Sequence, residues 1–136
     1  MDYIKKFLLY GIPMAIEFIV SELIGNFTHL YLDVAYFDKF MHTIGGILTT
    51  YLGYKYLEFL ESRGHLKVKS HVVRVFLVIS FMFFVAVTWE WYEYIKDVVY
   101  STSWQRDGYD ILGDLFFDFT GSIIFMTAIY FKSGKE

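Results

Sequence analysis

Two sets of acidic residues in the second half of the chain have the spacing of a helical face. Asp110, Asp114 and Asp118 recur every four residues, and Glu90 and Glu93 are three residues apart. Two like charges about 4 Å apart repel each other by about 4 kcal/mol at an effective dielectric constant of 20. Carboxylates gathered in one pocket therefore need a bound cation, bound protons or basic partners. The spacing thus points to cation binding or proton exchange.

A divalent metal ion is the compensation that the sequence favours. The nearby basic residues Lys39, Lys96 and Arg106 are expected in loops and are too few for the acids, whereas His42 follows Asp38 by one helical turn. Carboxylates suit Mg²⁺, Ca²⁺ or Mn²⁺, and an imidazole keeps Zn²⁺ and Fe²⁺ open. The predicted metal ligands are His42, Glu90, Asp114 and Asp118, with Glu93 or Asp110 as general base or supporting partner.

Several of these polar residues have plainer interpretations. Asp107 and Asp110 suit the start of a helix, because Asp is a favoured N-cap and Asp-Gly favours a turn. His42 taken alone is more often a hydrogen-bonded core histidine than a ligand. Glu17 and Glu22 either bond between helices or extend a polar path into the same cavity. These alternatives stay open at the level of sequence.

Composition restricts the class of protein to which these residues belong. The chain has 136 residues, of which 56% are hydrophobic and 22% aromatic, with no Cys and a net charge of −3. A soluble domain of this size could not bury so many apolar side chains, and a disordered chain would not contain them. The absence of Cys excludes disulfides and thiol catalysis, and the charge argues against nucleic-acid binding. A small integral membrane protein remains.

Four apolar stretches are long enough to cross a bilayer, at about residues 7–31, 40–60, 72–95 and 111–131. They are too long and too irregular for β-barrel strands, so helices are expected. The first stretch follows Lys5 and Lys6 as a signal peptide would, but Glu17 and Glu22 interrupt it, which favours a retained helix. The predicted fold is an all-α four-helix membrane bundle formed by one domain, residues 1–136.

The distribution of charge predicts the orientation of this bundle. Most Lys and Arg residues lie in the two termini and in the loop between the second and third stretches. By the positive-inside rule, both termini are cytoplasmic and the protein is a multi-pass protein of the plasma (inner) membrane. The acids then gather in the outer half. Gly45 and Gly46 follow His42 by about one turn and would let a neighbouring helix approach closely.

Three short motifs, taken in order, resemble a known type of membrane protein. They are Asp38-Lys39-x-x-His42, Trp89-Glu90-x-x-Glu93 and Asp110-x-x-x-Asp114-x-x-x-Asp118-x-x-Gly121. Together they are similar to small VanZ-like and YjdF-like membrane proteins over about residues 38–124. The resemblance implies a polytopic membrane protein with a polar site. VanZ-like proteins are associated with glycopeptide resistance, which suggests envelope lipids or lipid-linked precursors.

The leading functional hypothesis is divalent-metal binding near the outer leaflet, acting on a lipid phosphate or headgroup as a metal-dependent hydrolase or transferase. The alternative is a cation- or proton-coupled transporter or transporter subunit, with Glu17 and Glu22 extending the acidic path. A third reading is an assembly partner whose acids pair with another subunit. Membrane lipids are the expected partners, together with a second copy or another membrane subunit, and nucleic acid is not expected.

Overall fold

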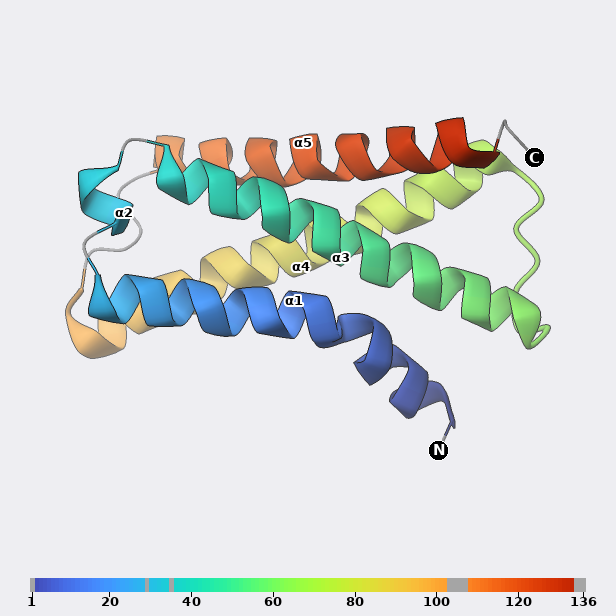
Figure 1. Cartoon of the computed structure of the whole chain (residues 1–136), viewed down its shortest axis with the longest axis horizontal. Coiled ribbons are helices and arrows are strands. Elements are labelled where there is room, and N and C mark those ends of the chain that lie inside the picture. Colours follow the sequence, from blue (N-terminus) through green and yellow to red (C-terminus); the bar gives the residue numbers. More distant parts are fainter. Residues whose placement is uncertain (1, 29, 35, 103–107, 134–136) are drawn as a thin grey trace.

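The computed structural model describes residues 2–28, 30–34, 36–102 and 108–133, and these form helices with no strand among them (Figure 1). The four long helices are α1 (Asp2–Phe27), α3 (Phe37–Ser62), α4 (His71–Tyr100) and α5 (Gly108–Ser133). A short helix, α2 (Leu30–Asp33), lies between α1 and α3. The predicted all-α bundle is therefore confirmed, and both described ends of the chain lie at the same end of it (Figure 1).

Local sequence features account for several of the helix ends. The first apolar stretch was expected to reach residue 31, but α1 ends at Phe27 and α2 forms a separate turn. Ser70 caps α4 by accepting a hydrogen bond from the backbone N–H of Val73 at 3.4 Å. Gly64 follows the end of α3 with φ of +75°, a left-handed conformation that glycine adopts without strain.

Three of the long helices are suited to cross a membrane by length and composition. Within the described residues these are Asp2–Gly25, His71–Tyr100 and Gly108–Lys132. The stretch at 40–60 was expected to be a fourth such segment, but α3 is not among them. It is long enough, with 26 residues, but it carries Asp38, Lys39 and His42 in its first turns and further charges near its end.

The position of α3 explains how it accommodates those polar residues. It packs against α1, α4 and α5, so that it forms the centre of the bundle (Figure 1). A Cβ atom on Gly46 would meet the backbone carbonyl of Asp118, and one on Gly121 would meet that of Thr43. The backbones of α3 and α5 therefore touch at these two glycines, as the predicted role of Gly46 requires.

Large apolar side chains cover the outside of the bundle. Ile16 of α1, Phe84 of α4 and Phe116 of α5 are 57%, 70% and 62% exposed. Many other large apolar residues of these helices are also exposed, among them Leu8, Phe76 and Leu112, whereas His42, Asp114 and Asp118 are buried. An apolar exterior around a polar interior matches a protein surrounded by lipid rather than by water.

Candidate functional site

His42 is the centre of the polar interior. Its Nδ1 lies 3.2 Å from Oδ2 of Asp118, and its Nε2 lies 3.4 Å from Oδ1 of Asp114 and 3.7 Å from Oδ1 of Asp38. The imidazole is buried because Gly46 brings α5 against α3 at this level. One ring therefore contacts carboxylates from two turns of α5 and from its own helix.

A second group of acids reaches the same imidazole from α4. Ligand atoms of His42, Glu90 and Glu93 lie within 4.8 Å of one another, and the same holds for Asp38, His42 and Asp114. Glu90 is buried, and Oε1 of Glu93 accepts a hydrogen bond of 3.0 Å from Nε1 of Trp89. His42 is thus shared by two groups whose donor atoms are imidazole nitrogen and carboxylate oxygen.

The position of Lys39 differs from the sequence prediction. It was expected in a loop, but it lies in the first turn of α3 and its side chain is mostly buried. Its Nζ donates at 2.6 Å to Oδ1 of both Asp110 and Asp114, and at 3.2 Å to Oδ2 of Asp38. The outer part of the acidic stripe is therefore neutralised in part by an ammonium group.

Lys96 was also expected in a loop and instead belongs to α4. Its Nζ lies 2.8 and 2.9 Å from the two carboxylate oxygens of Glu22, so α1 and α4 are joined by an ion pair. Of the two interpretations of Glu22, this ion pair favours the bond between helices over a polar path into the cavity. Arg106, the third basic residue considered, and Asp107 lie outside the described residues.

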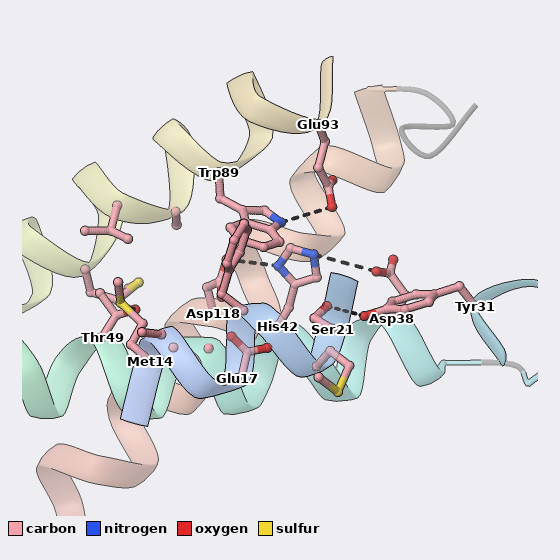
Figure 2. A pocket seen from close by; sticks show the side chains of 18 residues that line it. Met14, Glu17, Ser21, Tyr31, Asp38, His42, Thr49, Trp89, Glu93 and Asp118 are labelled. Atoms are coloured by element: carbon pink, nitrogen blue, oxygen red, sulfur yellow. Dashed lines mark hydrogen bonds and ion pairs between the residues drawn. The ribbon is translucent and has the colours of Figure 1, made fainter. Parts of the chain in front are cut away.

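A cavity of about 300 Å³ adjoins His42 between α1, α3 and α4 (Figure 2). Its charged lining consists of His42 with four carboxyl groups, from Glu17, Asp38, Glu93 and Asp118. Apolar side chains form much of the rest, including Met14, Phe18, Met82 and Val85. The cavity therefore has a polar end and an apolar body.

Near α2 the hydroxyl groups of Ser21 and Tyr31 form a hydrogen bond at the wall of the cavity (Figure 2). Both residues line the cavity. Burial raises the pKa of Tyr31, which lies in α2, to about 12. Its hydroxyl is therefore protonated at neutral pH and can both donate and accept hydrogen bonds.

All six predicted site residues lie in this polar interior. Glu90, Glu93, Asp114 and Asp118 surround the imidazole of His42, and Asp110 binds Lys39 beside it. Whether any of them binds a metal or acts in catalysis stays a prediction.

The structure adds three residues that the sequence analysis mentioned but did not assign as metal ligands or general base. Asp38 contacts His42 and Lys39, Glu17 lines the cavity, and Trp89 binds Glu93. For Asp38, the sequence signal was its position four residues before His42, which places both on one face of a helix.

The balance of charge around the cavity remains negative. Glu17 interacts electrostatically with His42 and Asp118, and Glu93 interacts with His42 and Glu90. Lys39 is bonded to Asp110 and Asp114 and also contacts Asp38 at 3.2 Å. For the other three carboxyl groups of the cavity, from Glu17, Glu93 and Asp118, His42 is the basic side chain of the lining that can offset their charge. A bound cation or bound protons would supply the missing positive charge.

These features define an all-helical membrane protein with a buried acid–histidine site. The chain belongs to a family of predicted membrane proteins, DUF2238, which matches residues 9–135. No curated protein and no solved structure matches the chain. The family match covers both groups of acids and His42.

Proposed function

We propose that this protein holds one divalent cation, Mg²⁺, Ca²⁺, Mn²⁺ or Zn²⁺, at His42 and presents it to the phosphate or headgroup of a membrane lipid. The observation that carries the proposal is the orientation of the ring. Nδ1 is held by Asp118 at 3.2 Å, while Nε2 faces Asp114 and Asp38. Metal-binding histidines commonly donate their other ring nitrogen to a carboxylate in this way, which fixes the tautomer and the ring orientation.

The separations around Nε2 support the same proposal. Ligands about 2.1 Å from one ion lie about 3.0–3.4 Å apart in octahedral and tetrahedral sites. Nε2 is 3.4 Å from Asp114 and 3.7 Å from Asp38, so small side-chain shifts would enclose an ion. The cation would compete with Lys39 for Oδ1 of Asp114, which both would use. In this arrangement Asp118 supports His42, and Glu90, whose carboxylate also lies near the imidazole, can add a further ligand.

The cavity favours an amphiphilic ligand. Its polar end contains His42 and the acids, and its apolar body contains Met14, Phe18 and Met82. About 300 Å³ is at the lower end of the range for small-molecule sites, which suits a headgroup and the start of an acyl chain. A cation bound there would offset phosphate charge or activate water, and Glu93 on the cavity wall is placed to accept a proton.

The family match gives a predicted membrane protein and no more. From the resemblance of its motifs to VanZ-like and YjdF-like proteins, we further propose an envelope lipid as the substrate class and the plasma membrane as the location. This resemblance rests on the motifs at Asp38-Lys39-x-x-His42, Trp89-Glu90-x-x-Glu93 and the α5 acids. The chemical class proposed is hydrolysis or transfer at a phosphate-bearing headgroup. A homo-oligomer or a membrane partner subunit is compatible with the exposed apolar helix faces.

Cation- or proton-coupled transport is the second candidate function, and Glu17 favours it. This carboxyl group lines the cavity from α1, about one and a half turns before the Glu22–Lys96 ion pair. It would extend an acidic path from His42 toward the other side of the bundle. Proteoliposomes loaded with a pH- or metal-sensitive dye would show flux that Glu17→Gln abolishes if this candidate is correct.

Metal titration tests the leading proposal directly. Protein purified in detergent, treated with chelator and then freed of it, is titrated with Mn²⁺ and Zn²⁺ by calorimetry, and its metal content is measured by elemental analysis. We expect about one ion per chain, lost in His42→Ala and retained in Glu58→Gln, an exposed acid on the same helix. Absence of stoichiometric binding of Mg²⁺, Ca²⁺, Mn²⁺ and Zn²⁺ would reject the metal site and leave transport as the better candidate.

A further inference from the structure

A second cavity, of about 520 Å³, lies between α1 and α3 at the end of the bundle that carries both described ends of the chain. It is separate from the acid–histidine site and independent of the function proposed for it. Its walls combine basic, aromatic and hydroxyl side chains: Lys6, Tyr10, Tyr51, Lys55, Phe59, Ser62 and Arg63, with Glu58 as its acid.

The shape of α1 accounts for this cavity. Pro13 lies inside α1, where its ring lacks an N–H and clashes with the carbonyl four residues earlier, and α1 bends in its N-terminal part (Figure 1). The first turn is nevertheless fastened to the end of α3. Tyr3 bonds Nε2 of His65 at 2.6 Å, and Asp2 pairs with Arg63. The bend and the fastened end leave a space bounded by both helices.

The charge of the cavity is positive, in contrast to the chain as a whole. Lys55 pairs with Glu58 at 2.8 Å, and Arg63 pairs with Asp2. Lys6 has no acidic partner among the described residues, and its Nζ lies 5.9 Å from the ring centre of Tyr10. The ammonium group of Lys6 on α1 is therefore not neutralised, and the paired cations Lys55 and Arg63 line the cavity from the side of α3.

We propose that this cavity binds the phosphate group of an anionic glycerophospholipid, with Lys6, Lys55 and Arg63 as its cationic contacts. Basic pockets between membrane helices are suited to anionic headgroups, and Arg and Lys donate strongly to phosphate oxygens. Tyr10 of α1 and Tyr51 of α3 add hydroxyl groups to the lining. The same helix, α1, exposes large apolar side chains such as Leu9, which is 51% exposed and which acyl chains could contact. The feature that the site recognises is a phosphate whose negative charge is not offset by a cation of the same headgroup.

Native mass spectrometry of the detergent-purified protein, titrated with phosphatidylglycerol or phosphatidylcholine, tests this proposal. We expect retained phosphatidylglycerol and much weaker retention of phosphatidylcholine. Each cation near a membrane surface contributes about fivefold to the affinity for anionic lipid, so Lys6→Gln/Lys55→Gln should lose about 25-fold. Lys6→Arg/Lys55→Arg should restore most of the binding, and Lys67→Gln/Lys69→Gln, exposed lysines of the loop at the same end, should change it little.

Soluble sn-glycerol 3-phosphate is the second arm of the experiment. If it binds with similar affinity and depends on Lys6 and Lys55, the cavity recognises the phosphate of a free metabolite as well as of a lipid. If it fails to bind or compete while phosphatidylglycerol binds, the lipid is the ligand. Equal retention of phosphatidylglycerol by the wild type, the Gln double variant and the loop control would overturn the proposal. So would equal retention of phosphatidylglycerol and phosphatidylcholine by the wild type.

Discussion

His42 and Asp118 are joined by a 3.2 Å contact between Nδ1 of the imidazole and Oδ2 of the carboxylate, across the closest approach of α3 and α5. The carboxylate fixes the direction of the ring, so that Nε2 faces Asp114 of α5 and Asp38 of α3. The backbone carbonyl of the same aspartate packs on Gly46. Asp118 thus couples the packing of two helices to the orientation of the residue most suited to hold a metal ion.

Replacing Asp118 with Ala should lower affinity for a divalent cation by about 10- to 100-fold, because the ring then loses the partner that orients it. Asp118→Asn should lose less, since its amide oxygen can still accept from Nδ1. Calorimetric titration with Mn²⁺ measures the change, and Glu58→Gln is the control for removing an acid from the protein. Wild-type affinity in Asp118→Ala would show that His42 does not depend on this carboxylate.

Gly46→Ala should destabilise the bundle by about 1–3 kcal/mol, because the added methyl group would collide with the backbone carbonyl of Asp118. The two helices must separate, and the contact between His42 and Asp118 lengthens with them. Thermal unfolding in detergent and Mn²⁺ titration should both show the effect. Gly11→Ala is the matched control, since the nearest atom to its Cβ is 3.9 Å away on Leu52. A Gly46→Ala protein as stable as Gly11→Ala would contradict the close approach.

The sequence predicted the helices and the acidic faces, because apolar length and four-residue spacing are local properties. It wrongly placed Lys39 and Lys96 in loops. The length of an apolar stretch reflects the part of a helix inside the hydrocarbon core of the bilayer, whereas the helix itself continues beyond that core. α3 begins at Phe37 and α4 ends at Tyr100, so both lysines are helical and meet acids of other helices. Such pairings depend on tertiary packing. The central position of α3 is also a property of tertiary packing, so the sequence did not distinguish α3 from the other spans. Its polar residues are tolerated because it lies at the centre of the bundle.

Lys39→Gln should destabilise the protein in chelator, because Asp110 and Asp114 lose the ammonium group that both contact at 2.6 Å. Breaking a largely buried ion pair costs about 3–5 kcal/mol. A divalent cation can replace the lost charge, so Mg²⁺ or Ca²⁺ should raise the melting temperature of Lys39→Gln more than that of the wild type. Lys69→Gln controls for the removal of an exposed lysine. Equal cation responses of Lys39→Gln and wild type would show that Lys39 does not compete at Asp114.

The cavity beside His42 should be reached by water, whereas the outer face of α1 should not. The chain contains no Cys, so single cysteines can be introduced without background reaction. Ser21 lines the cavity, and its neighbour Val20 is 42% exposed on the surface that we assign to lipid. A charged methanethiosulfonate reagent should therefore modify Ser21→Cys faster than Val20→Cys in proteoliposomes, because thiolate forms readily only where water reaches the thiol.

Reaction from one side of the membrane alone would support a site open to one leaflet. Reaction of Ser21→Cys and Glu17→Cys from both sides would instead favour a transport path, and equal rates at Ser21→Cys and Val20→Cys would show that the cavity is closed to water.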